Sequence, residues 1–337
     1  MNTRRFNKLL LDWFKLHARI LPWRSRGKVI TSSNASVNTL RDSTIASYFA
    51  QTQQRDPYHV VVAELMLQQT QVDRVISKYE EFLHKWPTLQ DLAKASLADV
   101  YIIWKGLGYN RRARYLHEMA KKIVEELDGI FPSDEASLKK LPGLGAYTAR
   151  AVRTFAFGKD VGVIDTNVER IFSRVMFGCE FQQVEISSKE FSEVVDCAVP
   201  LGKGDPWNQA LMDLGAGVCF ARTPKCDMCP LQDVCVANQQ AKEQKLQHYA
   251  ALLNTTRKNR ANDVKKKPKQ KFSESNRYFR GKIVDKLREG PIEMEMLWQY
   301  VSSQYNLSDR LRWGELIERL VIDKLIQIHG TQVSLAG

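Results

Sequence analysis

Asp165 and a glycine-rich turn are the groups of this 337-residue chain that most clearly could do chemistry. Asp165 follows an apolar run from Val161 to Ile164 and precedes an expected helix. The turn, Leu141-Pro142-Gly143-Leu144-Gly145, opens directly into another expected helix. Glycines let a backbone approach a ligand closely, and a helix N-terminus attracts anions. The two features together predict a phosphate-binding turn near a reactive carboxylate.

Glu64 is the second carboxylate of interest. It interrupts the run YHVVVAELMLQQT (58–70), which is apolar nearly all round and is expected to form a buried helix from residue 57 to 70. Asp56-Pro57 is a good start for such a helix. A buried carboxyl group needs a partner or has a raised pKa. Glu64 is therefore either a general acid or an ordinary ion-paired residue.

Four of the six cysteines fall close together, with the spacing Cys219-x6-Cys226-x2-Cys229-x5-Cys235. In an intracellular chain such a group indicates a metal site rather than disulfides. Four thiolates can hold a [4Fe-4S] cluster or a zinc ion. The spacing alone leaves both ligands open.

The overall composition favours a globular protein with a polyanionic partner. The net charge is +12 and the pI is near 9.4, which points to nucleic acid. No apolar run approaches the length of a membrane span, and the N-terminus lacks the apolar core of a secretory signal. We expect a cytoplasmic protein, associated with the nucleoid if the source is prokaryotic.

The elements that must position these groups are expected to be almost all helical. Helices are predicted at 5–20 and 57–70, three or four between 73 and 132, one at 133–140 and two within 188–217. Trp23 and Arg24 are expected in an extended segment. Residues 25–54 are predicted to be an inserted loop, and residues 241–275, within a polar stretch from 236, a basic linker. Three helices and a small hairpin in residues 276–337 predict a winged-helix-like module, and no strand-rich segment precedes residue 320.

The order of these motifs resembles the HhH-GPD superfamily of DNA glycosylases, in its endonuclease III branch, and especially the MutY-type adenine glycosylases. The matching segments are LPWR (21–24), RDPY (55–58), AELMLQQTQV (63–72), GLGYNRRAR (106–114), LPGLGAYTARAV (141–152), VIDTNVERI (163–171), WNQALMDLGAGVC (207–219) and the four cysteines. The resemblance implies an all-α, two-lobed helix-hairpin-helix glycosylase domain over residues 1–240. It also implies a [4Fe-4S] cluster in the cysteine loop and double-stranded DNA as the partner.

The resemblance assigns roles to single residues. Asp165 would be the catalytic aspartate, Glu64 the general acid, and Asn167 the holder of the aspartate or the water. Base removal builds an oxocarbenium-like sugar, which a carboxylate stabilises while an acid protonates the leaving base. The predicted DNA contacts are Gly143, Leu144, Gly145 and Arg111. By the same resemblance, Gln68 or Gln69 and Tyr109 would enter the duplex, and the base-pocket residues would be Trp23, Arg24 and Gln209. The cluster ligands would be Cys219, Cys226, Cys229 and Cys235.

Tyr147 bears on the type of reaction. Strand-cutting members of the superfamily carry a lysine at this position, which forms a Schiff base with the sugar. Tyrosine cannot do so, and the resemblance therefore implies removal of the base without strand cleavage.

The target base is left open by the sequence. Mismatched adenine is favoured by Glu64, Gln209 and the Gln68-Gln69-Thr70 match. A mismatched or modified pyrimidine, such as thymine, uracil or a substituted cytosine, is favoured by Tyr147, by the 25–54 insertion and by the lack of a counterpart to the MutY Nudix-like domain. A non-catalytic DNA-binding protein is the third hypothesis. We expect a monomer without a membrane partner, whose C-terminal module contacts DNA or a protein.

Overall fold

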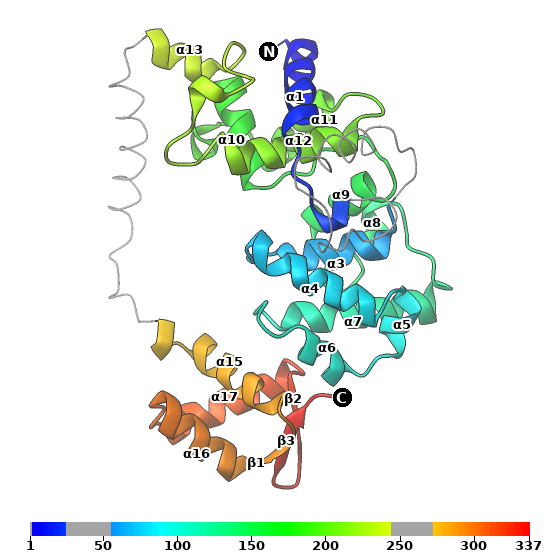
Figure 1. Cartoon of the computed structure of the whole chain (residues 1–337), viewed down its shortest axis with the longest axis vertical. Helices are drawn as coiled ribbons and strands as arrows, with labels where there is room; N and C mark the ends of the chain where they lie inside the picture. The colour runs from blue at the N-terminus through cyan, green and yellow to red at the C-terminus, as the bar shows by residue number, and fades with distance from the viewer. Residues whose placement is uncertain (1, 25–54, 244–271) are drawn as a thin grey trace, which may run out of the picture. The chain divides into compact units, whose positions relative to one another are not determined.

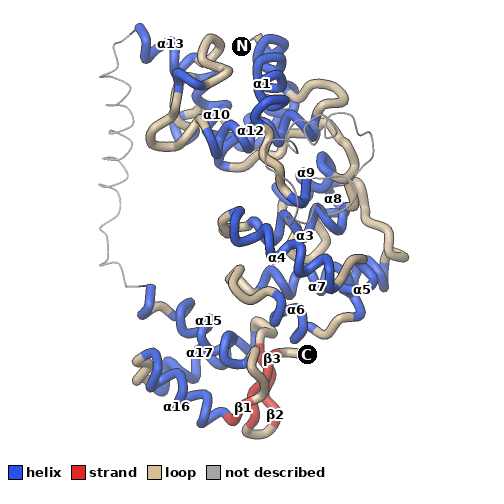
Figure 2. Tube along the Cα trace, in the orientation of Figure 1, coloured by secondary structure: helices blue, strands red, loops and turns tan. Residues whose placement is uncertain are grey.

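The computed structural model describes residues 2–24, 55–243 and 272–337. Within these ranges the chain is mostly helical, and the strands are confined to its C-terminal part (Figure 2). The all-α character predicted for the bulk of the chain is confirmed. The predicted insertion at 25–54 and most of the predicted linker lie outside the described residues.

The chain divides into two compact units, each built from separate segments. Unit 1 is Met1–Val60, Ser133–Ala136 and Gly145–Lys265, and unit 2 is Val61–Pro132, Ser137–Leu144 and Lys266–Gly337. The domain limits 1–240, 241–275 and 276–337 follow chain order and stay a prediction. The units are described separately below.

The regular elements in the described part of unit 1 are all helices or helical turns (Figure 1). Its elements are α1 (Thr3–His17), η1 (Pro22–Arg24), the start of α3 (Pro57–Leu67), the start of α8 (Glu135–Leu138), α9 (Ala146–Phe155), α10 (Thr166–Phe172), η2 (Ser173–Phe177), η3 (Phe181–Gln183), α11 (Ser188–Ala198), α12 (Gly204–Gly217), η4 (Cys226–Met228) and α13 (Val236–Glu243). Phe6 on α1, Phe172 on α10 and Trp207 on α12 pack edge to face at the centre of its core. These contacts fix α10, which follows Asp165, against α12.

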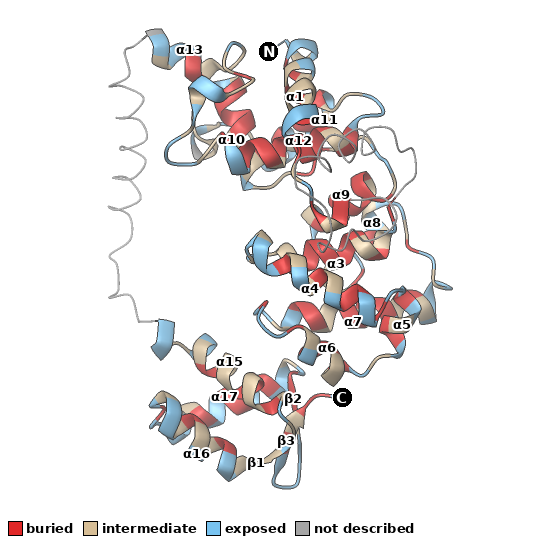
Figure 3. Ribbon diagram, viewed as in Figure 1, coloured by how far each residue is buried: buried red, intermediate tan, exposed pale blue. Residues whose placement is uncertain are grey.

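Unit 2 contains the rest of α3 and two further groups of elements. The first group is α4 (Val72–Lys85), α5 (Leu89–Lys94), α6 (Leu97–Ile103) and α7 (Arg111–Glu126); the second is η5 (Phe272–Glu274), α15 (Asn276–Leu287), β1 (Ile292–Glu293), α16 (Met294–Tyr305), α17 (Arg310–Ile322), β2 (Ile326–His329) and β3 (Gln332–Leu335). Figure 3 shows buried residues along the facing sides of α5 and α7, where Leu92 and Leu116 are fully buried. No helix of the described residues is long and apolar enough to cross a membrane.

The C-terminal module (residues 272–337) has the predicted winged-helix-like composition of three helices and a small sheet. Its sheet is antiparallel with the order β1-β3-β2, and Val333 on β3 pairs with both Ile292 and Ile328. Among the described residues the expectation that no strand-rich segment precedes residue 320 holds, but the sequence did not predict strand β1. It has only two residues, too few for an alternating pattern to be recognised.

Other boundaries also differ from the sequence-based expectation. The helix begun at Pro57 ends at Leu67, three residues early, because Gln69 adopts a left-handed backbone conformation with φ of 55°. Trp23 and Arg24 lie in a short 3₁₀ turn rather than an extended segment. The polar stretch from residue 236 begins with helix α13, since Ala237 packs into a buried position.

Candidate active site

Asp165 caps the N-terminus of α10. Its Oδ1 accepts hydrogen bonds from the backbone N–H groups of Asn167 and Val168, both at 2.8 Å. Its Oδ2 accepts a third, from Asn167 Nδ2, at 2.7 Å. These bonds satisfy orphan donors of the helix and fix the orientation of the carboxylate. The side chain remains half-buried, so it can be reached from outside the protein.

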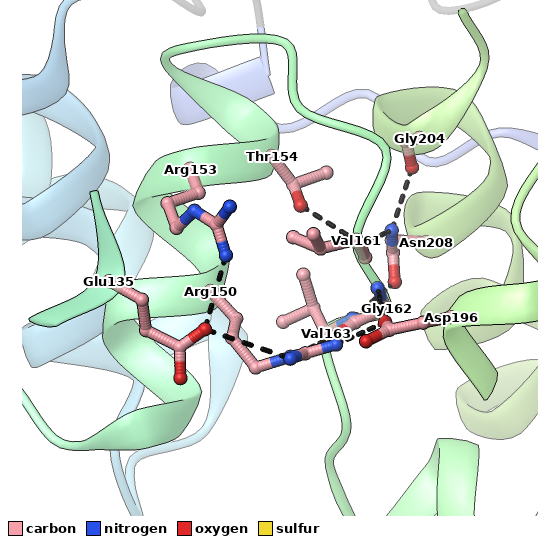
Figure 4. Close-up of polar contacts among 10 residues, drawn as sticks. All are labelled: Glu135, Arg150, Arg153, Thr154, Val161, Gly162, Val163, Asp196, Gly204 and Asn208. Carbon is pink, nitrogen blue, oxygen red and sulfur yellow. Dashed lines mark hydrogen bonds and ion pairs between the residues drawn. The ribbon is translucent and has the colours of Figure 1, made fainter. Parts of the chain in front are cut away.

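The extended segment Val161–Val163 leads into Asp165 and is held by side chains instead of a neighbouring strand (Figure 4). Asn208 on α12 is fully buried; it donates to Val161 O at 2.9 Å and accepts from Val163 N at 2.6 Å. Asp196 accepts from Gly162 N at 2.8 Å, and Arg150 donates to Gly162 O at 2.6 Å. Since a buried backbone group without a partner is costly, these bonds keep the segment in one conformation.

The same side chains are themselves tied together. Arg150 pairs with Asp196, and Arg150 and Arg153 on α9 both approach Glu135 (Figure 4). Thr154 donates to Val161 O at 3.0 Å. Helices α9, α11 and α12 therefore all contribute to placing Asp165.

Asn167 links Asp165 to the rest of unit 1. Its Oδ1 accepts from Arg170 Nη2 at 2.8 Å, and Arg170 also donates to the carbonyls of Gly215 and Cys219. Helix α12 approaches Asn167 so closely that a Cβ on Gly215 would lie 2.5 Å from the Asn167 Cβ. Asn167 is predicted to hold the aspartate. It would do so through its Nδ2 hydrogen bond to Asp165 Oδ2, while Gly215 packs against its side chain.

Glu169 is a second carboxyl group on the first turns of α10. Partial burial raises its pKa, and the negative charge of Asp165 raises it further. It was not singled out in the sequence, because nothing in its spacing distinguishes it from a solvated helical glutamate.

The glycine-rich turn joins the two units in the chain. In unit 2, Gly143 has φ of 79°, and a Cβ there would lie 2.7 Å from the Tyr115 Cβ, so both backbone and space require glycine. In unit 1, Gly145 is the N-cap of α9, no side chain caps this helix, and no atom lies within 4 Å of where a Cβ would be. This open, uncapped helix start suits a phosphate. Leu144 is buried, so only its backbone is available to a ligand.

The residues predicted for the base pocket all lie in unit 1. Gln209 is buried on α12 and Trp23 is buried in η1. Tyr147, which is predicted to be catalytic, is half-buried in the first turn of α9 in the same unit. Arg24 is committed to Asp213 through two hydrogen bonds of 2.8 Å. Burial by itself would raise the pKa of Asp213, but the hydrogen bonds and charges of Arg24 and Arg19 outweigh burial and lower it. Arg24 therefore fastens η1 to α12.

In unit 2, Glu64 is buried on α3, as predicted for the helix that carries it. The two candidate duplex-entering loops follow a common pattern: Gln69 and Tyr109 are both exposed and both have left-handed backbones, with φ of 55° and 47°. Such conformations are strained for residues other than glycine and persist where the surroundings impose them. Asp128, Asn306 and Lys324 also have left-handed backbones, so the conformation adds to the sequence-based prediction for these two loops and does not by itself mark them as functional.

Arg112 is what imposes the conformation of these loops. Its guanidinium donates to the carbonyls of Leu65, Met66, Gln68, Leu107 and Gly108 and to Thr70 Oγ1. Burial lowers its pKa to about 10, so it stays charged near neutral pH. Arg111, the residue predicted to contact DNA, is exposed at the start of α7 beside the Tyr115 ring.

The four clustered cysteines all line one cavity in unit 1, with Arg174, Val218 and Leu231 among its walls. Four thiols around a common cavity can together hold one metal group. Burial raises the pKa of Cys229 to about 12 and that of Cys235 to about 11, so binding of a positively charged group would have to draw off their protons. Arg174 anchors the loop through Phe220 O and Ala221 O, both at 2.8 Å.

Comparison with known proteins identifies the chain. Residues 62–197 match the HhH-GPD superfamily base excision DNA repair protein, and residues 219–235 match the iron-sulfur binding domain of endonuclease III. The adenine DNA glycosylase of Mycolicibacterium smegmatis is 32% identical over 334 residues, which cover 97% of this chain and 95% of that protein. The chain belongs to the HhH-GPD superfamily of base excision DNA repair proteins. The cysteine loop is accordingly its iron–sulfur binding domain, and a [4Fe-4S] cluster is the cofactor of this family.

Other relatives and solved structures agree with this placement. The human adenine DNA glycosylase is 40% identical over 243 residues, but the chain spans only 41% of that protein's length. A thermostable thymine-DNA glycosylase superposes with a TM-score of 0.58 at 27% identity, covering 71% of this chain and 97% of the other. An endonuclease III from a DNA complex superposes with a TM-score of 0.50 at 23% identity and supports the fold alone.

Sequence reasoning missed Asn208, Gly215, Arg170 and Asp213 as supports of the site. They sit inside the WNQALMDLGAGVC and VERI segments that carried the resemblance, so the signal was present. Their partners lie in distant segments, and only the fold reveals them.

Proposed function

We propose that the protein is a monofunctional adenine DNA glycosylase, which flips a mismatched adenine from duplex DNA and hydrolyses its N-glycosidic bond. The observation that carries the proposal is the placement of Asp165 at the end of a segment whose backbone groups are bonded by buried side chains. The choice of adenine rests on relatives of that name, one of them matched over nearly its whole length.

In the proposed mechanism Asp165 stabilises the positive charge that develops on the sugar as the bond to the base breaks. Three hydrogen bonds hold its carboxylate in place before the reaction begins, so little reorganisation is needed. Asn167 orients Oδ2, and Glu64 protonates the leaving adenine as general acid. Gln209 and Trp23 line the base pocket. Tyr147 offers no amine for a Schiff base, which leaves water as the acceptor of the sugar.

The DNA reaches this site with its target base out of the stack. Gly143 and Gly145 present backbone N–H groups to a phosphate, and Arg111 adds a positive charge. Gln69 and Tyr109 enter the duplex, at a cost of a few kcal/mol for unstacking. The loops that carry them suit this role, because hydrogen bonds from Arg112 hold both loops in a fixed conformation. A residue that enters the duplex has to keep its position against the stacked bases.

The cluster ligands in this proposal are Cys219, Cys226, Cys229 and Cys235. When bound, the iron–sulfur cluster ties the ends of this loop together, and we assign it no step in base removal. Arg222 and Lys225 in the loop are then held near the surface for DNA. We place the protein in the cytoplasm, associated with the nucleoid if the source is prokaryotic, and acting as a monomer.

Removal of thymine is the second candidate function. It is favoured by the similarity to the thymine-DNA glycosylase structure and by Tyr147. The two functions differ in the base released, and a direct assay separates them.

The test is a panel of duplexes carrying A opposite 8-oxoguanine, A:G, T:G, U:G and modified-cytosine pairs, each incubated with excess protein and then treated with alkali. Product from the adenine pairs, and strand cleavage only after alkali, is the expected result. Product from the T:G duplex alone would show that the protein excises thymine and not adenine. Strand cleavage without alkali would contradict the monofunctional assignment.

A further inference from the structure

The C-terminal module lies against the turn between α6 and α7 within unit 2. Tyr101 Oη donates to Lys324 O at 2.8 Å, and Arg114 Nη1 donates to Asp323 O at 2.8 Å. Arg288, at the end of α15, donates to Tyr101 O at 2.9 Å and to Asn110 Oδ1 at 3.2 Å. The module therefore packs against the loop that carries Tyr109 through these hydrogen bonds.

Tyr109 itself is contacted by the module. The guanidinium of Arg277, in the first turn of α15, lies over the Tyr109 ring at 3.9 Å from its centroid. The guanidinium of Arg112 lies over the same ring at 5.5 Å. Cation–π contacts of this kind stabilise by about 0.5–1 kcal/mol at exposed sites. A strained, exposed ring is thus braced from two different parts of unit 2.

Arg277 keeps its hydrogen-bonding capacity for another partner. It is exposed, its guanidinium lies over the rings of Tyr109 and Phe272, and among the described residues it makes no hydrogen bond or ion pair. Its neighbours differ: Arg280 pairs with Asp323, and Arg312 donates to Asn276 and Glu274. A guanidinium stacked on a ring still has five N–H donors for a phosphate.

The charge of the module argues for one local contact rather than a general basic surface. Residues 272–337 carry nine Lys or Arg and nine Asp or Glu, so the module is neutral although the whole chain has a charge of +12. A neutral module would not bind DNA by charge alone. A single arginine held beside the residue that enters the duplex is instead suited to one phosphate at a defined place.

We propose that Arg277 is a DNA-contacting residue, which braces Tyr109 and binds a backbone phosphate next to the step that Tyr109 enters. This rests on the proposed function for the role of Tyr109. It gives the C-terminal module a part in DNA recognition, and the partner it fits is the DNA backbone of the same substrate and not a separate protein.

The test compares Arg277→Ala and Arg277→Gln with Arg319→Ala. Arg319 is also exposed on the module, on α17, away from the Tyr109 contacts, so the control removes the same charge. Binding to a duplex with a non-hydrolysable abasic analogue is measured by fluorescence anisotropy between about 50 and 200 mM salt. Both Arg277 variants should bind about three- to ten-fold more weakly, with the salt slope reduced by about 0.9. Arg319→Ala should keep the wild-type slope.

The brace is tested by a double-mutant cycle with Tyr109→Ala. The combined loss of affinity should be smaller than the product of the two single losses, since the second change removes a contact already broken. The inference would be overturned if the Arg277 variants had the same salt dependence of DNA affinity as Arg319→Ala. It would also be overturned if the affinity losses of the Arg277 and Tyr109 variants simply multiplied in the double variant. Failure of the wild type to release any base would instead overturn the proposed function, because binding is measured without turnover.

Discussion

Gly215 packs closely against Asn167 in the proposed site. The glycine lies on α12 in the DLGAG segment, and because it has no side chain the helix can pack closely against Asn167. Asn167 in turn donates a hydrogen bond to Asp165. A glycine in a helix interior costs about 0.5–1 kcal/mol relative to alanine. The close approach explains why a glycine stands at this position.

Gly215→Ala should therefore reduce base excision by displacing Asn167 while leaving the protein folded. The added Cβ would lie 2.5 Å from the Asn167 Cβ, so one of the two must shift. We expect a loss of at least about ten-fold in the single-turnover rate, because a small misplacement of an orienting group is costly. The rate is measured by alkali cleavage of an adenine-mismatch duplex.

Gly217→Ala is the matched control, since no atom lies within 4 Å of a Cβ at that position on the same helix. It should keep the wild-type rate. Equal rates for the two variants would show that the contact with Asn167 does not matter for excision.

At the scale of elements, local patterns in the sequence predicted the helices well. Asp56 caps α3, accepting from Tyr58 N at 2.8 Å. The apolar periodicity located α1 to within a few residues and predicted the two helices α11 and α12 within residues 188–217. The failures have local causes. A left-handed Gln69 ended α3 early, and a two-residue strand had no periodicity to detect.

Partners between elements could not be predicted in the same way. Arg24 pairs with Asp213, which lies 189 positions away in the chain, and nothing in the local sequence indicates this partner. Arg111 and Arg112 are neighbours in the sequence, and only the fold shows that Arg112 is buried and Arg111 exposed. Such pairings depend on tertiary contacts that no periodicity encodes.

The Arg24–Asp213 pair gives a prediction on stability against pH. The pKa of Asp213 is lowered in the folded protein, so its contribution is present above the unfolded pKa of about 4 and is lost as pH falls through the folded value. Asp213→Asn should lower the free energy of unfolding by about 3–5 kcal/mol near neutral pH, because it leaves a buried charge unpaired. Urea unfolding at several pH values measures this.

The difference from wild type should shrink as pH falls below about 4. Asp12→Asn serves as the comparison: Lys15 and Lys8 lower the pKa of Asp12 to about 2, but its side chain is 45% exposed and its pairs are screened by solvent. It should change stability far less. A gap between wild type and Asp213→Asn that stays constant down to the acid limit would refute the assignment to ionised Asp213.

At the scale of the whole molecule, the iron–sulfur loop is attached to the elements that hold Asp165. Arg170 bonds both Asn167 and Cys219 O, and Arg174 bonds Phe220 O and Ala221 O while lying 3.5 Å from Cys219 Sγ. The loop thus shares its anchors with α10 and η2. Loss of order in the loop should therefore disturb the position of Asn167, because Arg170 is bonded to both.

Cys235→Ala should release the cluster and lower both thermal stability and excision. Iron content should fall well below about four atoms per chain, and the visible absorption of the cluster should fade. Cys197→Ala is the control, because Cys197 is exposed and lies outside the loop. A colourless, iron-free Cys235→Ala protein with unchanged unfolding temperature and excision rate would show that the cluster does not support the fold.

The most direct test of the account is Asp165→Asn, measured for binding and for excision on one adenine-mismatch duplex. The asparagine can still accept the backbone bonds at the start of α10, so the fold and the affinity for DNA should be retained. Without the negative charge, the sugar cation loses its main stabiliser, and single-turnover excision should fall by at least about 100-fold. Undiminished excision in a folded Asp165→Asn protein would contradict the central claim that this carboxylate carries the chemistry.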